Sequence, residues 1–226
     1  MNTKLAIVLV SGGMDSVTVA AMAKEAGYDL AFLHLDYGQN TSRKEFDCFK
    51  NIASFYKIPT DKTLTVDMTF LKSIGGSSLT DERIEVSDYQ GDSDIIPSSY
   101  VPFRNAHIIS TAVSWAEVLG AQAIYIGANH EDSPGYPDCR PEYYQAFNQL
   151  IKVGTKAGNI HIETPILHMR KSEIIQMALK LKAPLELSWS CYAKEDLACG
   201  VCDSCALRLR GFKEAGVLDP IKYAPH

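Results

Sequence analysis

Four cysteines crowd into the stretch "CYAKEDLACGVCDSC" near the C-terminal end of the sequence. Their spacing, C-x7-C-x2-C-x2-C, lets one tight turn, eased by Gly200, point three thiolates inward, and four thiolates suit a closed tetrahedral Zn²⁺ site. Because four protein ligands leave no open coordination position, we predict one structural zinc ion per chain, which ties the C-terminal segment to the rest of the protein. The predicted ligands are Cys191, Cys199, Cys202 and Cys205.

An iron–sulfur cluster is the main alternative, since C-x2-C-x2-C also occurs in ferredoxin-type sites. The fourth cysteine lies upstream and the usual C-x3-C-P tail is missing, which favours zinc. No secretory signal is evident at the N-terminus, so we expect a reducing, cytoplasmic setting, in which clustered cysteines favour metal over disulfides. Of the other two cysteines, Cys48 fits an apolar helix face and is expected in the core, and the role of Cys139 stays open.

The second stretch whose residues could do chemistry is "SGGMDS", residues 11–16, between an apolar run and a helical pattern. Gly12 and Gly13 permit close approaches that a β-carbon would block, so that successive backbone N–H groups form an anion site, reinforced by the positive end of the following helix. Asp15 can face a cation such as Mg²⁺ or cap the helix. We predict a phosphate site, with a plain capped turn as the alternative; its expected residues are Val10, Ser11, Gly12, Gly13, Met14, Asp15, Ser16 and Val17.

Buried apolar runs alternate with amphipathic patterns along the chain. The sequence predicts strands at 5–10, 30–38, 62–68, 121–129 and 159–167, and helices at 15–26, 42–56, 104–120, 142–155 and 171–181. This alternation indicates an α/β fold with a doubly wound parallel sheet of about five strands. Ligands bind beyond the carboxyl ends of such strands, so residues 11–16, 36–39 and 127–132 should share one edge. The polar, acidic stretch 73–100 is predicted as a loop or a mobile lid.

Composition narrows the class of protein. The 226 residues suit one domain with an appendage, which we place at 1–186 and 187–226. The net charge of −5 argues against a broad nucleic-acid surface. No apolar run is long enough to cross a membrane. We therefore expect neither direct nucleic-acid binding nor membrane association, and a homodimer is one open oligomeric state.

The loop resembles the pyrophosphate-binding loop S-G-G-x-D-S of the ATP pyrophosphatase (PP-loop) family at every fixed position. The stretches "VPFRN", "IGANHEDSPGYPDCRPEYYQAFN", "TPILHMRKSEI" and "SWSC…CGVCDSCALR" are similar to the 7-cyano-7-deazaguanine synthases, or QueC family, nearly from end to end. The resemblance implies an adenine nucleotide alpha hydrolase-like fold and a loop that grips a leaving pyrophosphate, for which no lysine inside the loop is required.

The implied enzyme is a ligase of queuosine biosynthesis that forms a C–N bond. It converts 7-carboxy-7-deazaguanine, ammonia and ATP to 7-cyano-7-deazaguanine by transferring AMP first to the carboxylate and then to the resulting amide. No glutaminase domain fits beside this fold in 226 residues, so ammonia is expected to arrive free.

Within this interpretation, several residues outside the loop are assigned to ATP. Arg104 is a charged donor fork suited to phosphate or carboxylate, Asn105 could orient the same groups, and Lys171 could supply the charge that the loop lacks. The alternatives are a surface ion pair for Arg104 and a solvated side chain for Lys171. Asp36 and Gln39 are expected near the ribose or adenine, unless Asp36 merely caps a helix; Gly127 completes the edge. The predicted catalytic residues are Asp15, Ser16, Arg104 and Lys171.

A second group is assigned to the deazaguanine substrate. Its guanine-like edge presents N–H donors and calls for a carboxylate, for which the candidates are Glu131, Asp132 and Asp138. Arg140 could pair with the substrate carboxylate, and Tyr136 or Trp189 could stack on the base, although core packing is the more frequent role of such rings. His130 is the acid–base candidate, whereas the histidines expected to be structural are His34 and His107.

Two other functions remain open from the sequence. A PP-loop tRNA sulfurtransferase would need a broad basic surface and an available cysteine, and neither is evident. A non-catalytic nucleotide-binding zinc protein would bind ATP without turnover.

Overall fold

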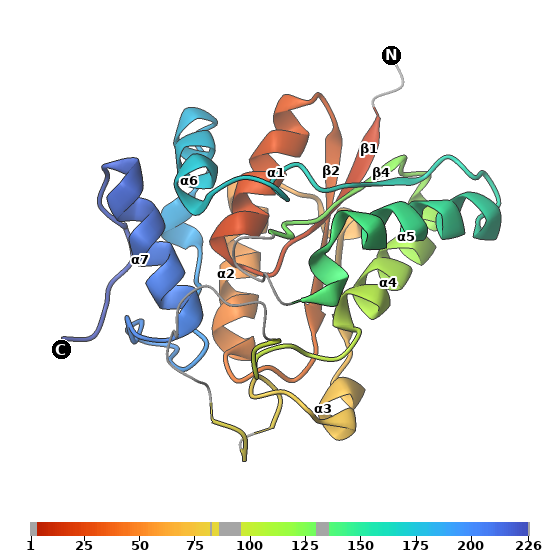
Figure 1. Ribbon diagram of the computed structural model, residues 1–226. Helices are drawn as coiled ribbons and strands as arrows, with labels where there is room; N and C mark the ends of the chain where they lie inside the picture. The colour runs from red at the N-terminus through yellow and green to blue at the C-terminus, as the bar shows by residue number, and fades with distance from the viewer. Residues whose placement is uncertain (1–3, 82, 86–95, 130–135, 226) are drawn as a thin grey trace.

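The computed structural model describes residues 4–81, 83–85, 96–129 and 136–225. Five parallel strands form one sheet in the order β3-β2-β1-β4-β5 (Figure 1). They are β1 (Leu5–Leu9), β2 (Asp29–Asp36), β3 (Thr63–Asp67), β4 (Ala123–Tyr125) and β5 (His161–Glu163). Each strand overlaps its predicted range, and the predicted parallel sheet is confirmed.

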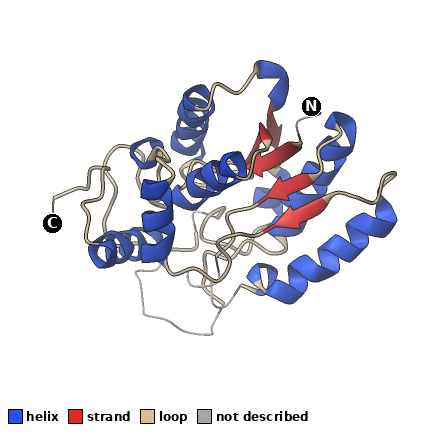
Figure 2. Ribbon diagram, turned by 90° about the horizontal axis from the view of Figure 1, so that it is seen from above, coloured by secondary structure: helices blue, strands red, loops and turns tan. Residues whose placement is uncertain are grey.

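Helices cover both faces of this sheet, which lies between them in Figure 2. On one side lie α1 (Met14–Glu25), α2 (Ser42–Phe55), α6 (Lys171–Lys180) and α7 (Asp203–Ala215). On the other lie α3 (Phe70–Ile74), α4 (Arg104–Leu119) and α5 (Pro141–Gly154). Short 3₁₀ turns occupy Thr60–Lys62, Pro137–Cys139 and Leu185–Leu187. In the part of the chain described, no helix is long and apolar enough to span a bilayer.

Strand β1 shows why two separate cores form. Ala6 and Val8 pack with the first group of helices, whereas Ile7 and Leu9 pack with the second. Successive side chains of a strand point to opposite faces, so a strand that is apolar throughout requires cover on both sides. The apolar run at 5–10 thus accounts for the central position of β1.

The centre of the sheet contains its topological switch point. β1 and β4 are neighbours, yet the chain continues from β1 into α1 on one face and from β4 toward α5 on the other. Loops that diverge in this way leave a crevice beyond the carboxyl ends of the strands, where ligands of open α/β sheets bind. The predicted residues 11–16 lie at this crevice.

The C-terminal segment is built into the same core as the sheet. Cys191, Ala198, Cys205 and Phe212 pack in one cluster with residues of β1, α1 and α6, and α7 lies along α6 (Figure 1). The sequence did not predict α7 or α3. The proposed division at residue 186 stays a prediction, since the two parts share this core.

The polar stretch 73–100 is partly interior. Ser77, Ser78, Leu79 and Thr80 are buried, and the Leu79 carbonyl accepts the backbone N–H of Asn40 at 3.1 Å. This part of the stretch is therefore anchored on the loop that follows β2. Residues 82 and 86–95 lie outside the described residues, and the predicted lid stays a prediction.

Candidate active site and metal centre

The turn between β1 and α1 lies directly against the first turn of α2. Gly12 has a φ of +94°, and a β-carbon built on it would lie 2.7 Å from the Glu45 carbonyl oxygen and 3.1 Å from Cys48 Cβ. Both the left-handed backbone and the close approach require glycine. Cys48 is 6% exposed, so its predicted place in the core is confirmed.

The start of α1 is arranged to receive an anion. Ser11 Oγ accepts the Gly13 N–H at 3.2 Å, and the Ser16 hydroxyl donates to the Gly13 carbonyl at 2.8 Å. No side chain of the described residues caps the helix, whose N-cap is Gly13. The structure thus contradicts the alternative of a plain capped turn, and the first N–H groups of α1 remain available at the positive end of its dipole.

Lys171 forms an ion pair with a residue of this turn. Its Nζ lies 2.9 Å from Asp15 Oδ2 and 3.1 Å from Oδ1, and the two side chains are 6% and 20% exposed. The alternative of a solvated lysine is therefore wrong. A partly buried ion pair thus places one positive and one negative group at the turn where the sequence predicts phosphate and a cation.

The loop after β4 closes on the same turn. A β-carbon on Gly127 would lie 3.1 Å from both the Asp15 carbonyl carbon and the Ser16 nitrogen. The predicted proximity of Gly127 to residues 11–16 is thus seen in the structure, and glycine there lets the two loops touch.

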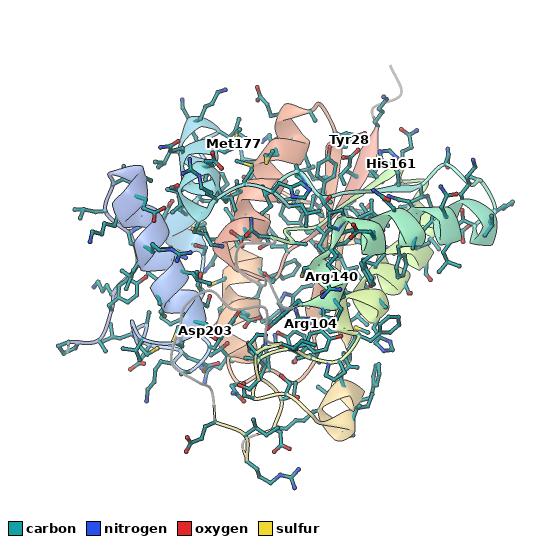
Figure 3. All side chains as sticks on the ribbon, viewed as in Figure 1. Tyr28, Arg104, Arg140, His161, Met177 and Asp203 are labelled. Carbon is teal, nitrogen blue, oxygen red and sulfur yellow. The ribbon has the colours of Figure 1, made fainter. Side chains whose placement is uncertain are left out.

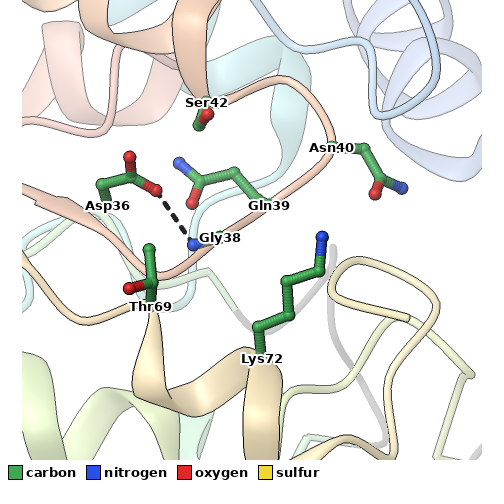
Figure 4. Close-up of a pocket in the computed structure, with 7 residues that line it drawn as sticks. All are labelled: Asp36, Gly38, Gln39, Asn40, Ser42, Thr69 and Lys72. Atoms are coloured by element: carbon green, nitrogen blue, oxygen red, sulfur yellow. Dashed lines mark hydrogen bonds between the residues drawn. The ribbon is translucent and has the colours of Figure 1, made fainter. Parts of the chain in front are cut away.

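A pocket of about 510 Å³ opens beyond the end of β2; its lining residues are Asp36, Gly38, Gln39, Asn40, Ser42, Thr69 and Lys72 (Figure 4). Asp36 Oδ1 accepts the Gly38 N–H at 2.9 Å, and Gln39 Oε1 accepts the Tyr37 N–H at 3.0 Å. Asp36 therefore shapes the turn after β2 rather than capping α2, which begins after Thr41. Asp36 and Gln39 thus line one pocket, and their predicted place near the ribose or adenine stays a prediction.

Glu45, which the sequence analysis does not single out, contacts the pocket residue Gln39. Its carboxylate accepts hydrogen bonds from Gln39 Nε2 and Thr41 Oγ1, each at 2.9 Å. Burial raises the pKa of Glu45 to about 7, against the lowering effect of these two hydrogen bonds. A glutamate in the first turn of a helix is common, so nothing in the local sequence distinguishes this one; its burial follows from the packing of the folded protein.

Arg104 faces the end of β2 across the crevice. Its Nη1 donates to the Tyr37 hydroxyl at 3.2 Å, and the guanidinium lies 5.1 Å from the Tyr37 ring centroid. Arg104 makes no ion pair with any carboxylate of the described residues, so the surface ion pair considered above is not found. Phe103, which precedes it, has a φ of +56°, a costly conformation for an aromatic residue that fixes how the chain enters α4.

Asn105 and Asp138 join the starts of α4 and α5. The Asn105 backbone N–H donates to Asp138 Oδ2 at 3.2 Å, and Asn105 Nδ2 donates to the Asp138 carbonyl at 3.1 Å. Burial raises the pKa of Asp138, which is 2% exposed. Cys139, whose role was open, lies beside them, with its sulfur 3.7 Å from Asn105 Nδ2.

Three buried polar atoms in this region have no hydrogen-bond partner among the described residues: Arg104 Nε, Asp138 Oδ1 and Tyr143 Oη. Buried polar atoms are nearly always paired, because an unpaired one loses its hydration without compensation. These three atoms lie at the edge of the sheet where the sequence predicts that ligands bind. A substrate or water molecule bound there would complete their hydrogen bonds.

The aromatic candidates are packed in this structure. Tyr136 is 6% exposed, with its ring 5.2 Å from that of Tyr100 and its hydroxyl 2.9 Å from Ser99 Oγ. Trp189 is 5% exposed, and Lys44 Nζ lies 4.6 Å from its ring centroid. Packing is thus the role that the structure shows for both rings, and stacking on the base stays a prediction.

The remaining predicted residues divide into exposed, interior and undescribed ones. Arg140 is exposed at the start of α5, at the same edge of the sheet as Arg104 (Figure 3). His34 is buried, stacks on Phe49 at 5.0 Å between ring centroids, and has a pKa lowered by burial, as a structural histidine would. The candidates outside the described residues are His130, Glu131 and Asp132.

The four clustered cysteines converge on one point. Their sulfur atoms all lie within 4.8 Å of one another, and none of the cysteines forms a disulfide. Tetrahedral coordination with bonds of about 2.3 Å places the sulfurs roughly 3.8 Å apart, and Cys199 and Cys205 have their sulfurs 3.9 Å apart.

Hydrogen bonds favour the thiolate form of one of the four cysteines, Cys191. The Cys191 sulfur accepts three backbone N–H groups at 3.3–3.4 Å, from Ala193, Lys194 and Cys199. Hydrogen bonds from Cys202 and Cys205, together with these N–H groups, lower the pKa of Cys191. The donor set therefore fits a metal ion held by four sulfurs, and the convergence predicted from the spacing is confirmed.

Fold and site together define an α/β protein with an uncapped glycine turn at the switch point of a parallel sheet and a segment whose four cysteines could hold a metal ion. The family model described as "Queuosine biosynthesis protein QueC" matches residues 5–216, and the chain belongs to this family.

Two relatives show how close the likeness is. The chain is 53% identical over 219 residues to the 7-cyano-7-deazaguanine synthase of Chloroherpeton thalassium, covering 96% of each chain. It is 55% identical over 221 residues to the enzyme of the same name from Chlorobium phaeobacteroides, again covering 96% of each. Among solved structures, a 4-thiouridine synthetase–RNA complex with bound ATP aligns with a TM-score of 0.49 at 17% identity, over 80% of this chain and 41% of that chain.

Proposed function

We propose that the protein is a ligase of queuosine biosynthesis that converts 7-carboxy-7-deazaguanine, ammonia and ATP to 7-cyano-7-deazaguanine. The observation that carries the proposal is the identity of 53% and 55%, over 96% of the chain, to proteins named 7-cyano-7-deazaguanine synthase. The uncapped turn at residues 11–16 supports it, because it suits an ATP whose pyrophosphate departs.

The chemistry needs two activations. First, a carboxylate oxygen attacks the α-phosphorus of ATP and pyrophosphate leaves. Ammonia attacks the resulting acyl adenylate, and AMP departs with the former carboxylate oxygen as a proton is released, giving the amide. The amide oxygen then attacks the α-phosphorus of a further ATP, and pyrophosphate leaves again. Departure of AMP with this second oxygen and of two protons from nitrogen leaves the nitrile.

The residues around the turn are suited to bind the ATP that each of the two activations consumes. The N–H groups of the turn and the hydroxyls of Ser11 and Ser16 would hold the pyrophosphate, whose developing charge they stabilise. Lys171 and Arg104 would add positive charge from either side of the crevice, with Asn105 orienting the same groups. The pocket at Asp36 and Gln39 would take the nucleoside. Gly127, which lies against Asp15 and Ser16, would border the nucleotide beside the turn.

The orphaned atoms near α4 and α5 favour Asp138 among the candidates for the base edge. Its Oδ1 has no partner in the described part of the chain, and a carboxylate oxygen is the acceptor that N–H donors require. Arg140 would pair with the substrate carboxylate. Glu131 and Asp132 stay candidates from the sequence, as do Tyr136 and Trp189 for stacking.

Two metal ions complete the proposal. The four thiolates suit Zn²⁺, which would hold the C-terminal segment together without taking part in the reaction. Asp15, a carboxylate that is 20% exposed at the turn, would share Mg²⁺ with the phosphates, since that ion is commonly bound by one or two carboxylates and substrate oxygens.

Ammonia is proposed to reach the site as a free molecule. The protein itself is proposed to act in the cytoplasm, without binding nucleic acid directly. The oligomeric state, with a homodimer as one candidate, is a matter for measurement. The sulfurtransferase alternative is not favoured, because the relatives carry the synthase name and the clustered cysteines converge on one metal-binding point.

The test is to incubate metal-loaded protein with ATP, Mg²⁺, ammonium chloride and 7-carboxy-7-deazaguanine, and to follow the deazaguanine by mass spectrometry. We expect the amide and then the nitrile, and neither when ATP is omitted. Absence of the nitrile with folded, metal-loaded protein would contradict the proposal. ATP binding without turnover would instead support the non-catalytic alternative.

A further inference from the structure

The C-terminal segment contacts the phosphate turn directly. The Trp189 backbone N–H donates to the Gly12 carbonyl at 2.8 Å, and a β-carbon on Gly13 would lie 3.6 Å from the Trp189 carbonyl oxygen. The segment that contains the four cysteines therefore forms one wall of the turn.

A second contact runs through α7 and α6. Gly211 is buried in the interior of α7, and a β-carbon there would lie 2.4 Å from Lys171 Cγ, 2.9 Å from Lys171 Cβ and 3.0 Å from Ile175 Cδ1. Such distances are below contact for carbon atoms, so even one added methyl group would force Lys171 or the whole of α6 to move.

Helix propensity does not account for this glycine. Gly211 is not one of the glycines with a positive φ, so its backbone conformation does not require glycine. Glycine inside a helix costs about 1 kcal/mol relative to alanine. The close approach of α6 does account for it. The side chain that occupies the vacated space is Lys171, whose stem passes Gly211 and whose Nζ reaches Asp15.

We propose that Gly211 is a positioning residue of the ATP site: the absence of a side chain on α7 lets Lys171 lie flat between the helices and sets its ammonium against Asp15. The four-cysteine segment then has a task beyond holding a metal ion, because its last helix fixes a charge at the phosphate turn. The inference rests on the proposed function in one respect, that ATP phosphates bind at this turn.

Gly211→Ala tests the proposal, with Gly154→Ala as the matched control. Gly154 is also helical, but a β-carbon there meets nothing within 4 Å. In full-length, metal-loaded protein, Gly211→Ala should weaken the affinity for Mg²⁺–ATP, measured by calorimetry, by about tenfold, which corresponds to ~1.4 kcal/mol. Gly154→Ala should leave that affinity unchanged.

A double-mutant cycle separates positioning from general packing. Lys171→Met keeps the stem that meets the new methyl group but removes the ammonium. In that background, Gly211→Ala should lower the thermal midpoint as much as in the wild type, yet change the ATP affinity less than about twofold. An equal loss of ATP affinity in both backgrounds, or an unchanged affinity in folded Gly211→Ala, would overturn the proposal.

Folding of the variant is itself informative. If Gly211→Ala does not accumulate as folded protein, adding Lys171→Gly, which deletes the Lys171 atoms at 2.4 Å and 2.9 Å, should restore it; failure to do so would overturn the assigned contact. These outcomes are distinct from failure of the proposed function, which would appear as wild-type protein that binds ATP but makes no nitrile.

Discussion

The ammonium of Lys171 and the carboxylate of Asp15 form an ion pair between residues 156 positions apart, with 2.9 Å between Nζ and Oδ2. Lys171 is the first residue of α6, where the helix dipole disfavours a cation. Asp15 offsets this cost at a partly buried position, so the pair both joins α6 to the turn and orders two charges where phosphates are expected.

Replacing Asp15 by Ala should reduce nitrile formation at least about 100-fold while leaving a folded protein. It should also lower the free energy of unfolding by roughly 1–3 kcal/mol, because a buried ammonium loses its partner. Steady-state assays and urea denaturation measure the two effects. As a control, Asp15→Ala combined with Lys171→Met should recover stability but not turnover. Turnover near the wild-type rate in Asp15→Ala would show that the pair has no role in the reaction.

Glu45 should make stability depend on pH in a defined direction. Its pKa is about 7 in the folded protein, against a usual value of 4.5, so between these values the folded state binds more protons than the unfolded state. Stability should therefore fall, relative to Glu45→Gln, as the pH rises from about 4.5 to about 7, and the difference should level off above.

Denaturant unfolding of the wild type and of Glu45→Gln across this pH window gives the difference between their free energies of unfolding. Changes that both proteins share, such as metal loss at acid pH, cancel in that difference. We expect a total of roughly 1–3 kcal/mol after allowance for partial exposure. A difference that is flat between pH 5 and 7 would show that folding does not raise the pKa of Glu45, and one that rises with pH would show that folding lowers it; either result would contradict the prediction.

Gly12→Ala should weaken ATP binding strongly, because the new methyl group meets the Glu45 carbonyl in a backbone of positive φ. The expected loss of stability is about 2–4 kcal/mol, from strain and overpacking together. Gly27→Ala is the matched control: its φ is +83°, yet a β-carbon there meets nothing within 4 Å. It should cost only about 1 kcal/mol and leave ATP affinity unchanged. Equal effects of the two substitutions would mean that backbone strain alone, not the contact with α2, sets the turn.

Cys202→Ser should reduce bound metal well below one ion per chain and lower solubility and the thermal midpoint together, because the sulfurs converge on one point that is part of the core. Metal analysis and calorimetry measure both. Cys139→Ser, a buried cysteine outside the cluster, should keep its metal. A Cys202→Ser protein with full metal content and unchanged stability would refute the structural role.

The sheet and the turn could be predicted because their information is local. Apolar runs mark buried strands, and the glycine pair between a run and a helical pattern marks the loop. The four cysteines are equally local, within fifteen residues of sequence. The sequence does not predict helix α7, because its residues, "DSCALRLRGFKEA", begin inside the cysteine cluster, where the cysteine spacing indicates a metal-binding turn.

Relations between distant segments could not be predicted. The contact of Arg104 with Tyr37 spans 67 residues. Burial in the folded protein is what raises the pKa of Glu45, and the glycine at position 211 is explained only by the stem of Lys171 beside it. A single sequence specifies which side chains are able to bind phosphate; which of them are buried, paired or orphaned follows from the packing of helices on the sheet.

The transfer of AMP to the substrate can be followed with 7-carboxy-7-deazaguanine carrying ¹⁸O in both carboxylate oxygens. Each activation moves one of these oxygens onto the α-phosphorus, so mass spectrometry should find ¹⁸O in AMP after amide formation and again after nitrile formation, with none in pyrophosphate. Nitrile that forms with unlabelled AMP, or with label in pyrophosphate or inorganic phosphate, would contradict the account.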